Sequence, residues 1–179
     1  MNPAANLILV GPTGAGKTCI GRRLAGHYGL RLHDTDREIE RRTGASVGTI
    51  FECEGEAGFR IRERATLAQL LADDGVLLAT GAGAVLDPDN RRLLQARGFV
   101  VHLRVSPAQQ LARLAHDCSR PLLQRADRDA VLEEMAIRRA PLYAEVADMQ
   151  FDTDGHAAAD AAARLIEQLG RRWHRGVAA

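Results

Sequence analysis

Lysine is almost absent from this chain. Of the 24 basic residues, Lys17 is the only lysine and the others are arginines. GTPases that are specific for guanine usually read the base with an Asn-Lys-x-Asp segment. Because the one lysine stands elsewhere, this chain cannot contain that segment, and this mode of guanine recognition is excluded.

Excess charge and long apolar runs are also missing. The formal net charge of +1 gives no general attraction to nucleic acid or to an anionic membrane. No apolar run approaches the roughly 20 residues that a bilayer-spanning helix needs. The first five residues lack the basic start and apolar stretch of a signal peptide. We therefore expect neither a nucleic-acid nor a membrane partner.

Cysteines are few and scattered. Cys19, Cys53 and Cys118 form no CxxC pair, and any disulfide scheme leaves one of them unpaired. This usage suits a reducing compartment, so we expect a cytoplasmic protein whose thiols are buried or incidental. A thiol pKa can fall at a helix N-terminus, where Cys19 is expected, but a packing role in the interior is the prediction for this residue.

The length of 179 residues suits one domain, 1–179, with a substantial core. Short apolar runs predict strands at 7–10, 30–33, 76–79, 99–105 and 149–152. Patterning and end signals predict helices at 18–27, 37–42, 49–54, 58–72, 90–97, 107–116, 130–139 and 157–169. Strands alternating with helices predict an α/β fold with a parallel sheet covered on both faces.

Three further segments have expected characters. The helix at 58–72 is expected to carry apolar residues at Ile61, Ala65, Ala68 and Leu71. The polar, arginine-rich segment at about 117–128 is a candidate loop or lid. For the tail at 170–179, a frayed terminus is preferred over a basic patch.

The segment GPTGAGKT, Gly11 to Thr18, follows the apolar run at 7–10 directly. Its spacing fits a phosphate-binding loop, in which glycines let successive backbone N–H groups point at an anion. Lys17 would reach the β/γ-phosphates and the Thr18 hydroxyl would bind Mg²⁺. A glycine-rich turn without a ligand is the alternative, but a strand before it and a helix after it favour nucleotide binding. The expected nucleotide contacts are Gly14, Ala15, Gly16, Lys17, Thr18 and Cys19.

Two aspartates follow the second expected strand. Motor ATPases usually place a metal-positioning Asp at the end of a long apolar strand, but the strand at 99–105 ends in Ser106-Pro107. Asp34 and Asp36 would share a face if their segment stays extended. One could hold Mg²⁺ while the other accepts a proton from an attacking hydroxyl. An N-cap aspartate beside a surface aspartate is the alternative.

Several segments together resemble the shikimate kinases, from Asn6 to about Leu169. They are GPTGAGKTCIGRRLA from Gly11, DTDREIERRTGASVGTIFECEGEAGFRIRE from Asp34, ATGAGAV from Ala79, SRPLL from Ser119 and RAPLYAEVAD from Arg139. The resemblance implies transfer of the γ-phosphoryl group of ATP to the 3-hydroxyl of shikimate, on the way to chorismate and the aromatic amino acids. It also implies a five-stranded parallel sheet in a three-layer α/β/α P-loop kinase like the nucleoside monophosphate kinases. The family leans to monomers.

On the nucleotide side, the resemblance implies that Lys17 contacts the phosphates. Thr18 and Asp34 would hold Mg²⁺, the latter through water. Arg113 and the segment at 152–155, Asp154 included, would border the adenine.

On the acceptor side, the resemblance implies a substrate-binding helical region at about 34–63. Asp36 would bind the substrate hydroxyls and act as the base, while Arg60 and Arg139 clamp the carboxylate. Guanidinium groups suit a carboxylate better than lysine does, because they can bind it through two parallel hydrogen bonds. Arg120 would swing in on the lid towards the phosphates. Glu63, three residues after Arg60, is expected to orient that arginine.

The loop after the third strand departs from the family. It reads Gly81-Ala82-Gly83, where the family has three glycines. The resemblance places these backbone N–H groups against the substrate, where added bulk or a required positive φ would cost about 1 kcal/mol. If Ala82 has an ordinary φ and its Cβ points away from the substrate, the change is tolerated. Otherwise shikimate binding is weakened or the site has drifted towards a related polyol acid.

Two other functions therefore stay open beside shikimate kinase. One is a relative that phosphorylates gluconate or another sugar acid. The other is a nucleotide-binding regulatory protein that has lost catalysis.

Overall fold

The computed structural model describes residues 4–115 and 127–174. Its five strands are β1 (Leu7–Val10), β2 (Arg31–Asp34), β3 (Val76–Ala79), β4 (Phe99–Arg104) and β5 (Met149–Asp152). All neighbouring strands pair in parallel, in the order β2-β3-β1-β4-β5. This sheet confirms the predicted α/β fold. β1 and β3 are buried at every residue, which is why they read as continuous apolar runs.

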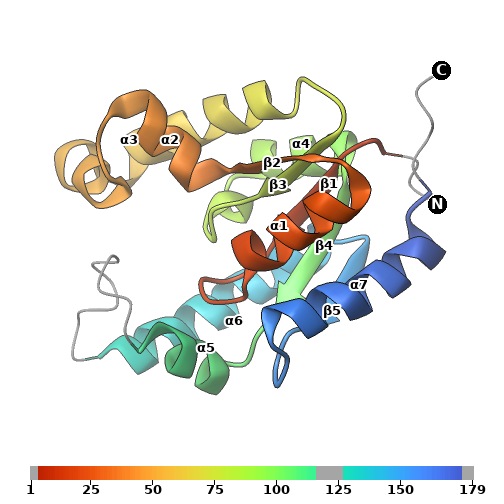
Figure 1. Cartoon of the computed structure of the whole chain (residues 1–179). Coiled ribbons are helices and arrows are strands. Elements are labelled where there is room, and N and C mark those ends of the chain that lie inside the picture. Colours follow the sequence, from red (N-terminus) through yellow and green to blue (C-terminus); the bar gives the residue numbers. More distant parts are fainter. Residues whose placement is uncertain (1–3, 116–126, 175–179) are drawn as a thin grey trace.

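Helices cover both faces of the sheet (Figure 1). They are α1 (Lys17–Tyr28), α2 (Thr35–Thr43), α3 (Val47–Leu70), α4 (Pro88–Arg97), α5 (Pro107–Leu114), α6 (Arg128–Val146) and α7 (Ala158–Arg172). Successive side chains of a strand point to opposite faces. Leu7 and Leu9 accordingly join a core with α1 and α7, whereas Ile8 and Val10 join a second core with α3, α4 and α6. Among the described residues, none of the helices is both long and apolar enough to cross a membrane.

Asn6 directly precedes β1 and connects three segments at the amino end of the sheet. It is fully buried, and its Nδ2 donates to the carbonyls of Asp73 at 3.1 Å and Arg97 at 3.0 Å. Its Oδ1 accepts from the backbone N–H of Val76 at 2.9 Å. Because a buried amide must find partners, these bonds fix where β1 starts relative to β3 and to the end of α4.

Helix α3 shows where the predicted helix break lies. The sequence predicts two helices, 49–54 and 58–72, but the structure has one segment that bends at Gly55 without an intervening loop. Gly55 has φ 69° and ψ −177°, a conformation outside the helical region that glycine adopts readily. The break is therefore a single residue within one continuous element.

The predicted apolar face of this helix is wrong. Ile61 is 71% exposed, and Ala65 and Ala68 are also exposed, so that only Leu71 of the four is buried. The buried face instead consists of Phe59, Glu63, Thr66, Leu67 and Leu70. Two of these residues, Glu63 and Thr66, are polar, so the spacing of apolar residues does not reveal this face.

The C-terminal helices are longer than predicted. α6 continues through Pro141 to Val146, although proline disfavours a helix interior and the prediction ends at residue 139. α7 reaches Arg172, and Trp173 is only 5% exposed. Its Nε1 donates to the carbonyl of Ala4 at 2.8 Å, and its ring meets Tyr28 edge-on. Fraying is therefore wrong for 170–173, because this indole anchors the end of α7. Residues 175–179, and 117–126 of the predicted lid, lie outside the described residues.

Candidate active site

The glycine-rich loop lies between β1 and α1, at the carboxyl edge of the sheet. Gly14 and Gly16 have φ of 80° and 87°, values that L side chains rarely adopt. Lys17 Nζ folds over the loop and donates to the carbonyls of Gly11 at 2.7 Å and Pro12 at 2.8 Å. The ammonium group and the N-terminus of α1 thus both lie at this loop, and their positive charge favours the binding of an anion there. Ala15, the loop's remaining expected contact, is buried.

Cys19 lies on the first turn of α1 and is exposed. The expected packing role in the interior is therefore wrong, because this position of α1 faces away from both cores. Cys53 is exposed as well, and neither of these two described cysteines forms a disulfide. Cys118 lies outside the described residues.

Arg113 links the glycine-rich loop to the segment after β5. Its Nη1 donates to the carbonyl of Gly14 at 3.1 Å and to Oγ1 of Thr153 at 2.9 Å, and its Nη2 donates to the Thr153 carbonyl at 2.6 Å. Next to it, Asp154 accepts a hydrogen bond from the backbone N–H of Ser106 at 3.0 Å. The structure therefore brings both predicted adenine neighbours to the edge of the loop.

Asp34 caps helix α2 and contacts the glycine-rich loop at the same time. Its Oδ1 accepts from the backbone N–H groups of Asp36 at 3.1 Å and Arg37 at 3.3 Å. Its Oδ2 accepts from the hydroxyl of Thr18 at 2.5 Å. The condition for a shared face is not met, because this cap starts the helix at Thr35, and Asp34 is the N-cap aspartate of the alternative. The Asp34 carboxylate consequently contacts Thr18, whereas that of Asp36 lies against Gly81.

Asp36 and two residues of α3 gather around the loop after β3. A Cβ atom added at Gly81 would lie 2.7 Å from Oδ1 of Asp36 and 2.8 Å from Oε1 of Glu63. A Cβ atom at Gly83 would overlap the guanidinium of Arg60, with Nη1 at 2.7 Å. A Cβ atom at either position would force these side chains to shift, so the backbone and the three charged side chains form one compact surface.

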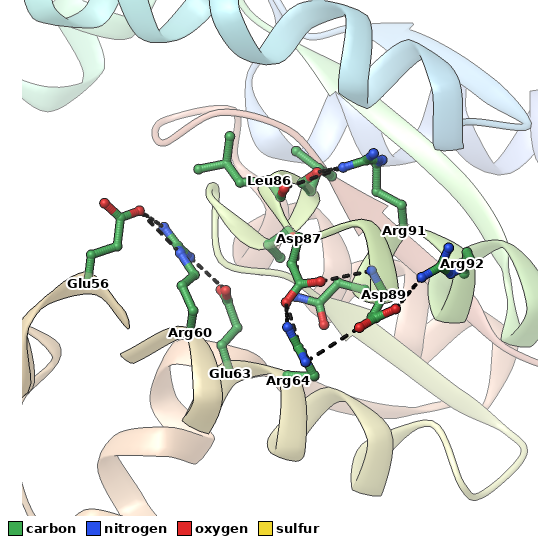
Figure 2. Close-up of polar contacts among 12 residues, drawn as sticks. Glu56, Arg60, Glu63, Arg64, Leu86, Asp87, Asp89, Arg91 and Arg92 are labelled. Carbon is green, nitrogen blue, oxygen red and sulfur yellow. Dashed lines mark hydrogen bonds and ion pairs between the residues drawn. The ribbon is translucent and has the colours of Figure 1, made fainter. Parts of the chain in front are cut away.

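Arg60 is held between two carboxylates, as Figure 2 shows. Its Nη1 donates to Oε2 of Glu63 at 2.6 Å, and its Nη2 to Oε1 of Glu56 at 3.1 Å. The Glu63 side chain is fully buried, and that of Arg60 is 19% exposed. The predicted pairing of Glu63 with Arg60 is confirmed. One nearly buried guanidinium is thereby fixed in direction beside Gly83.

Burial governs the ionisation of Glu63. It raises the pKa of this carboxyl to about 7, even though the charge of Arg60 and its hydrogen bond act in the opposite direction. The charges of Asp36 and Asp87 add to the effect of burial. The second oxygen of Glu63, Oε1, has no hydrogen-bond partner among the described residues.

Ala82 meets the backbone condition for a tolerated substitution. None of the described non-glycine residues has a positive φ, and Ala82 is one of them. Its carbonyl accepts a hydrogen bond of 2.6 Å from the hydroxyl of Tyr143 on α6. The sequence does not single out Tyr143, although its place four residues after Arg139 puts both on one helix face.

A cavity of about 350 Å³ opens between the glycine-rich loop and α6. Pro12 and Thr13 line one side, and Arg139 and Tyr143 line the other. Arg139 therefore shares this cavity with the phosphate-binding segment and lies on the helix whose Tyr143 bonds to the Gly81–Gly83 loop. The remaining predicted site residue, Arg120, lies outside the described residues.

Comparison with known proteins gives concordant results. A family model for shikimate kinase matches residues 13–170. A curated shikimate kinase from Stenotrophomonas maltophilia strain R551-3 is 59% identical over 98% of this chain and 97% of its own length. The structure of shikimate kinase from Acinetobacter baumannii in complex with shikimate is 43% identical, with a TM-score of 0.90 over 94% of each chain. A shikimate kinase structure from Bacteroides thetaiotaomicron is 32% identical with a TM-score of 0.83, over 92% of this chain and 98% of that one. These matches favour neither the sugar-acid kinase nor the regulatory protein that the sequence left open.

Proposed function

The chain belongs to the shikimate kinase family, and we propose that its site transfers the γ-phosphoryl group of ATP to the 3-hydroxyl of shikimate. The products are shikimate 3-phosphate and ADP, and the step belongs to the route to chorismate and the aromatic amino acids. The observation that carries the proposal is the surface at Gly81 and Gly83, where Asp36, Glu63 and Arg60 crowd against the backbone. A polyhydroxylated acid needs such a combination of a hydroxyl acceptor and a cationic clamp.

Asp36 binds the acceptor hydroxyls and takes the proton of the one that attacks. Phosphoryl transfer depends mainly on alignment and on neutralising charge, so a correctly placed carboxylate is sufficient as the base. The position of Asp36 in the first turn of α2, facing Gly81, supports this role.

Arg60 and Arg139 bind the carboxylate of the acceptor. Glu63 and Glu56 bind different nitrogens of the Arg60 guanidinium and so fix its plane. Arg139 lies on α6, the helix whose Tyr143 bonds to the same loop. Two guanidinium groups of fixed direction select a planar carboxylate and thereby set which ring hydroxyl faces the nucleotide.

Lys17 and the N-terminus of α1 bind the phosphates of ATP, and Arg113 and Asp154 border the adenine. From the resemblance alone, Arg120 moves towards the phosphates during transfer. The Arg113 bonds to Gly14 and Thr153 support the adenine assignment, because they tie the phosphate loop to the segment that would face the base.

Mg²⁺ accompanies the nucleotide, held by the Thr18 hydroxyl and, through water, by Asp34. Two oxygen donors 2.5 Å apart beside the phosphate loop suit this ion, which proteins usually bind with one or two carboxylates plus phosphate oxygens. Residues 4–115 and 127–174 offer no cluster of three or more His, Cys, Asp or Glu residues for a metal. Phosphate oxygens and water would supply the other ligands. When bound, the ion neutralises charge on the transferring group.

We further propose a cytoplasmic monomer with a single domain. The formal net charge of +1 and the scattered cysteines, which form no CxxC pair, support the cytoplasmic location.

An ADP-release assay with shikimate, quinate and gluconate tests the function. We expect Mg²⁺-dependent turnover with shikimate, lost on chelation of the metal. Asp36→Asn should lower kcat far more than the affinity for ATP, because the lost group acts on the acceptor. Turnover of gluconate alone, or ATP binding with no acceptor-dependent turnover, would refute the proposal.

A further inference from the structure

Tyr143 lies between Arg139 on α6 and the Gly81–Gly83 loop. Its hydroxyl donates to the carbonyl of Ala82 at 2.6 Å. Arg139, one helical turn earlier on α6, lines the same cavity as Tyr143, and its charge acts on the phenol. Tyr143 therefore links the helix that carries Arg139 to the loop whose Gly83 packs against Arg60.

The bond to Ala82 orients a backbone donor. The carbonyl of one residue and the N–H of the next point to opposite sides of a trans peptide, and none of the described peptide bonds is cis. Because Tyr143 draws the Ala82 carbonyl towards α6, the N–H of Gly83 points away from α6. The same peptide brings Gly83 against the Arg60 guanidinium. The phenol thus sets the direction of the Ala82–Gly83 peptide, which lies against the arginine that Glu56 and Glu63 hold.

The phenol ring itself has little freedom. Tyr143 is only 3% exposed, and the ring of His102 stacks on it with centroids 4.8 Å apart and an angle of 29° between the planes. Burial lowers the pKa of His102 to about 4, so the stacking ring is neutral at physiological pH. Removing the hydroxyl would leave the ring and its packing in place.

We propose that Tyr143 is a positioning residue that holds Arg139 and the Gly81–Gly83 loop in register, so that Arg60 and Arg139 bind one carboxylate together. This inference rests on the proposed function, since the clamp acts on the acceptor. Tyr143 itself takes no part in the transfer.

Tyr143→Phe tests the inference, and the chain supplies a matched control. Its only other tyrosine, Tyr28, donates its hydroxyl to the carbonyl of Ile166 at 3.3 Å, between α1 and α7. In Tyr143→Phe, the KM for shikimate should rise about three- to tenfold, the usual effect of one lost hydrogen bond. The kcat and the KM for ATP should stay within about twofold of the wild type. Tyr28→Phe should change none of these constants.

Hydrogen exchange without substrate separates this inference from the proposed function. The amides of Ala84 and Leu86 donate to the carbonyls of Gly81 and Gly83 at 3.1 and 3.0 Å, so their exchange reports the order of the loop. Both should exchange faster in Tyr143→Phe and unchanged in Tyr28→Phe. A wild type with no shikimate-dependent turnover would refute the function, but this exchange result would still stand.

Two results would overturn the role of Tyr143. One is a Tyr143→Phe variant that matches Tyr28→Phe in both KM and loop exchange. The other is a parallel change in both KM values together with a lowered Tm, which would mean that the hydroxyl only supports the fold.

Discussion

At the scale of single residues, positions 81, 82 and 83 of the loop after β3 have different surroundings. At positions 81 and 83 a Cβ atom would force carboxylates or a guanidinium to shift, because these groups lie against the backbone there. Position 82 has an ordinary φ, and its carbonyl faces Tyr143. None of the three positions has a positive φ, so the departure from the family requires no unusual backbone and falls between the two positions where a Cβ atom would meet charged side chains.

Gly83→Ala should damage acceptor binding. The new Cβ displaces Arg60 from its place beside Glu63, so we expect the KM for shikimate to rise by about 10- to 100-fold, with little change in the KM for ATP. Steady-state kinetics against both substrates measures this. Ala82→Gly is the control and should change the KM for shikimate less than tenfold. Equal effects of the two substitutions would contradict the assignment.

Glu63→Gln should reveal the raised pKa as a pH dependence of stability. The carboxyl has a pKa of about 7 in the folded protein and an ordinary value of 4.5, so folding takes up a proton between these values. As pH rises from about 4.5 to about 7, the free energy of unfolding of the wild type should fall relative to that of the variant.

Urea unfolding at pH 5, 6, 7 and 8 measures this difference. Glu52→Gln, which changes an exposed residue of the same helix, is the control. The prediction fails if the difference between wild type and Glu63→Gln is independent of pH, or if it moves in favour of the wild type as pH rises.

At the scale of elements, the sequence predicts the features that depend on neighbouring residues alone. The glycine-rich loop and the apolar strands follow from spacing and composition, and both are where they were expected. The start of α2 does not follow from spacing, because Asp34 both ends β2 and caps the helix through the backbone N–H groups of Asp36 and Arg37. The buried face of α3 depends on Glu63, whose burial is compensated by Arg60. No apolar pattern signals such a position.

The glycine-rich loop permits a direct chemical test. An amine-directed reagent can modify only Lys17 and the N-terminal amine. Since Lys17 Nζ lies over the loop, ATP at ten times its Kd should slow modification of this lysine about tenfold. The N-terminal amine, followed by mass spectrometry in the same sample, is the internal control. Equal labelling of Lys17 with and without ATP would contradict the nucleotide site.

At the scale of the whole molecule, parallel strands bring distant segments to one edge. The glycine-rich loop, Asp34 and Gly81 follow β1, β2 and β3, and ligands of such sheets bind at the carboxyl ends of strands. This general rule predicts the place of the site from the sequence. It does not predict that α6 contributes Tyr143, because the packing of α6 on the sheet is a tertiary property.

Asn6→Ala should destabilise the whole fold without altering the site. It removes three hydrogen bonds, one of them fully buried at the Val76 N–H, at a cost of about 2–4 kcal/mol in the free energy of unfolding. Urea unfolding measures the loss, and kcat of the folded enzyme should not change. Asn90→Ala, which removes one bond to the Ala84 carbonyl, should cost less. An equal or smaller loss at Asn6 would disprove its linking role.

The most direct test of the central claim is ³¹P nuclear magnetic resonance of the purified protein with ATP, Mg²⁺ and shikimate. The site described here predicts one new phosphomonoester, coupled to the ring proton at carbon 3, formed in step with ADP. Inorganic phosphate as the only new product, or an ester formed on gluconate but not on shikimate, would contradict it.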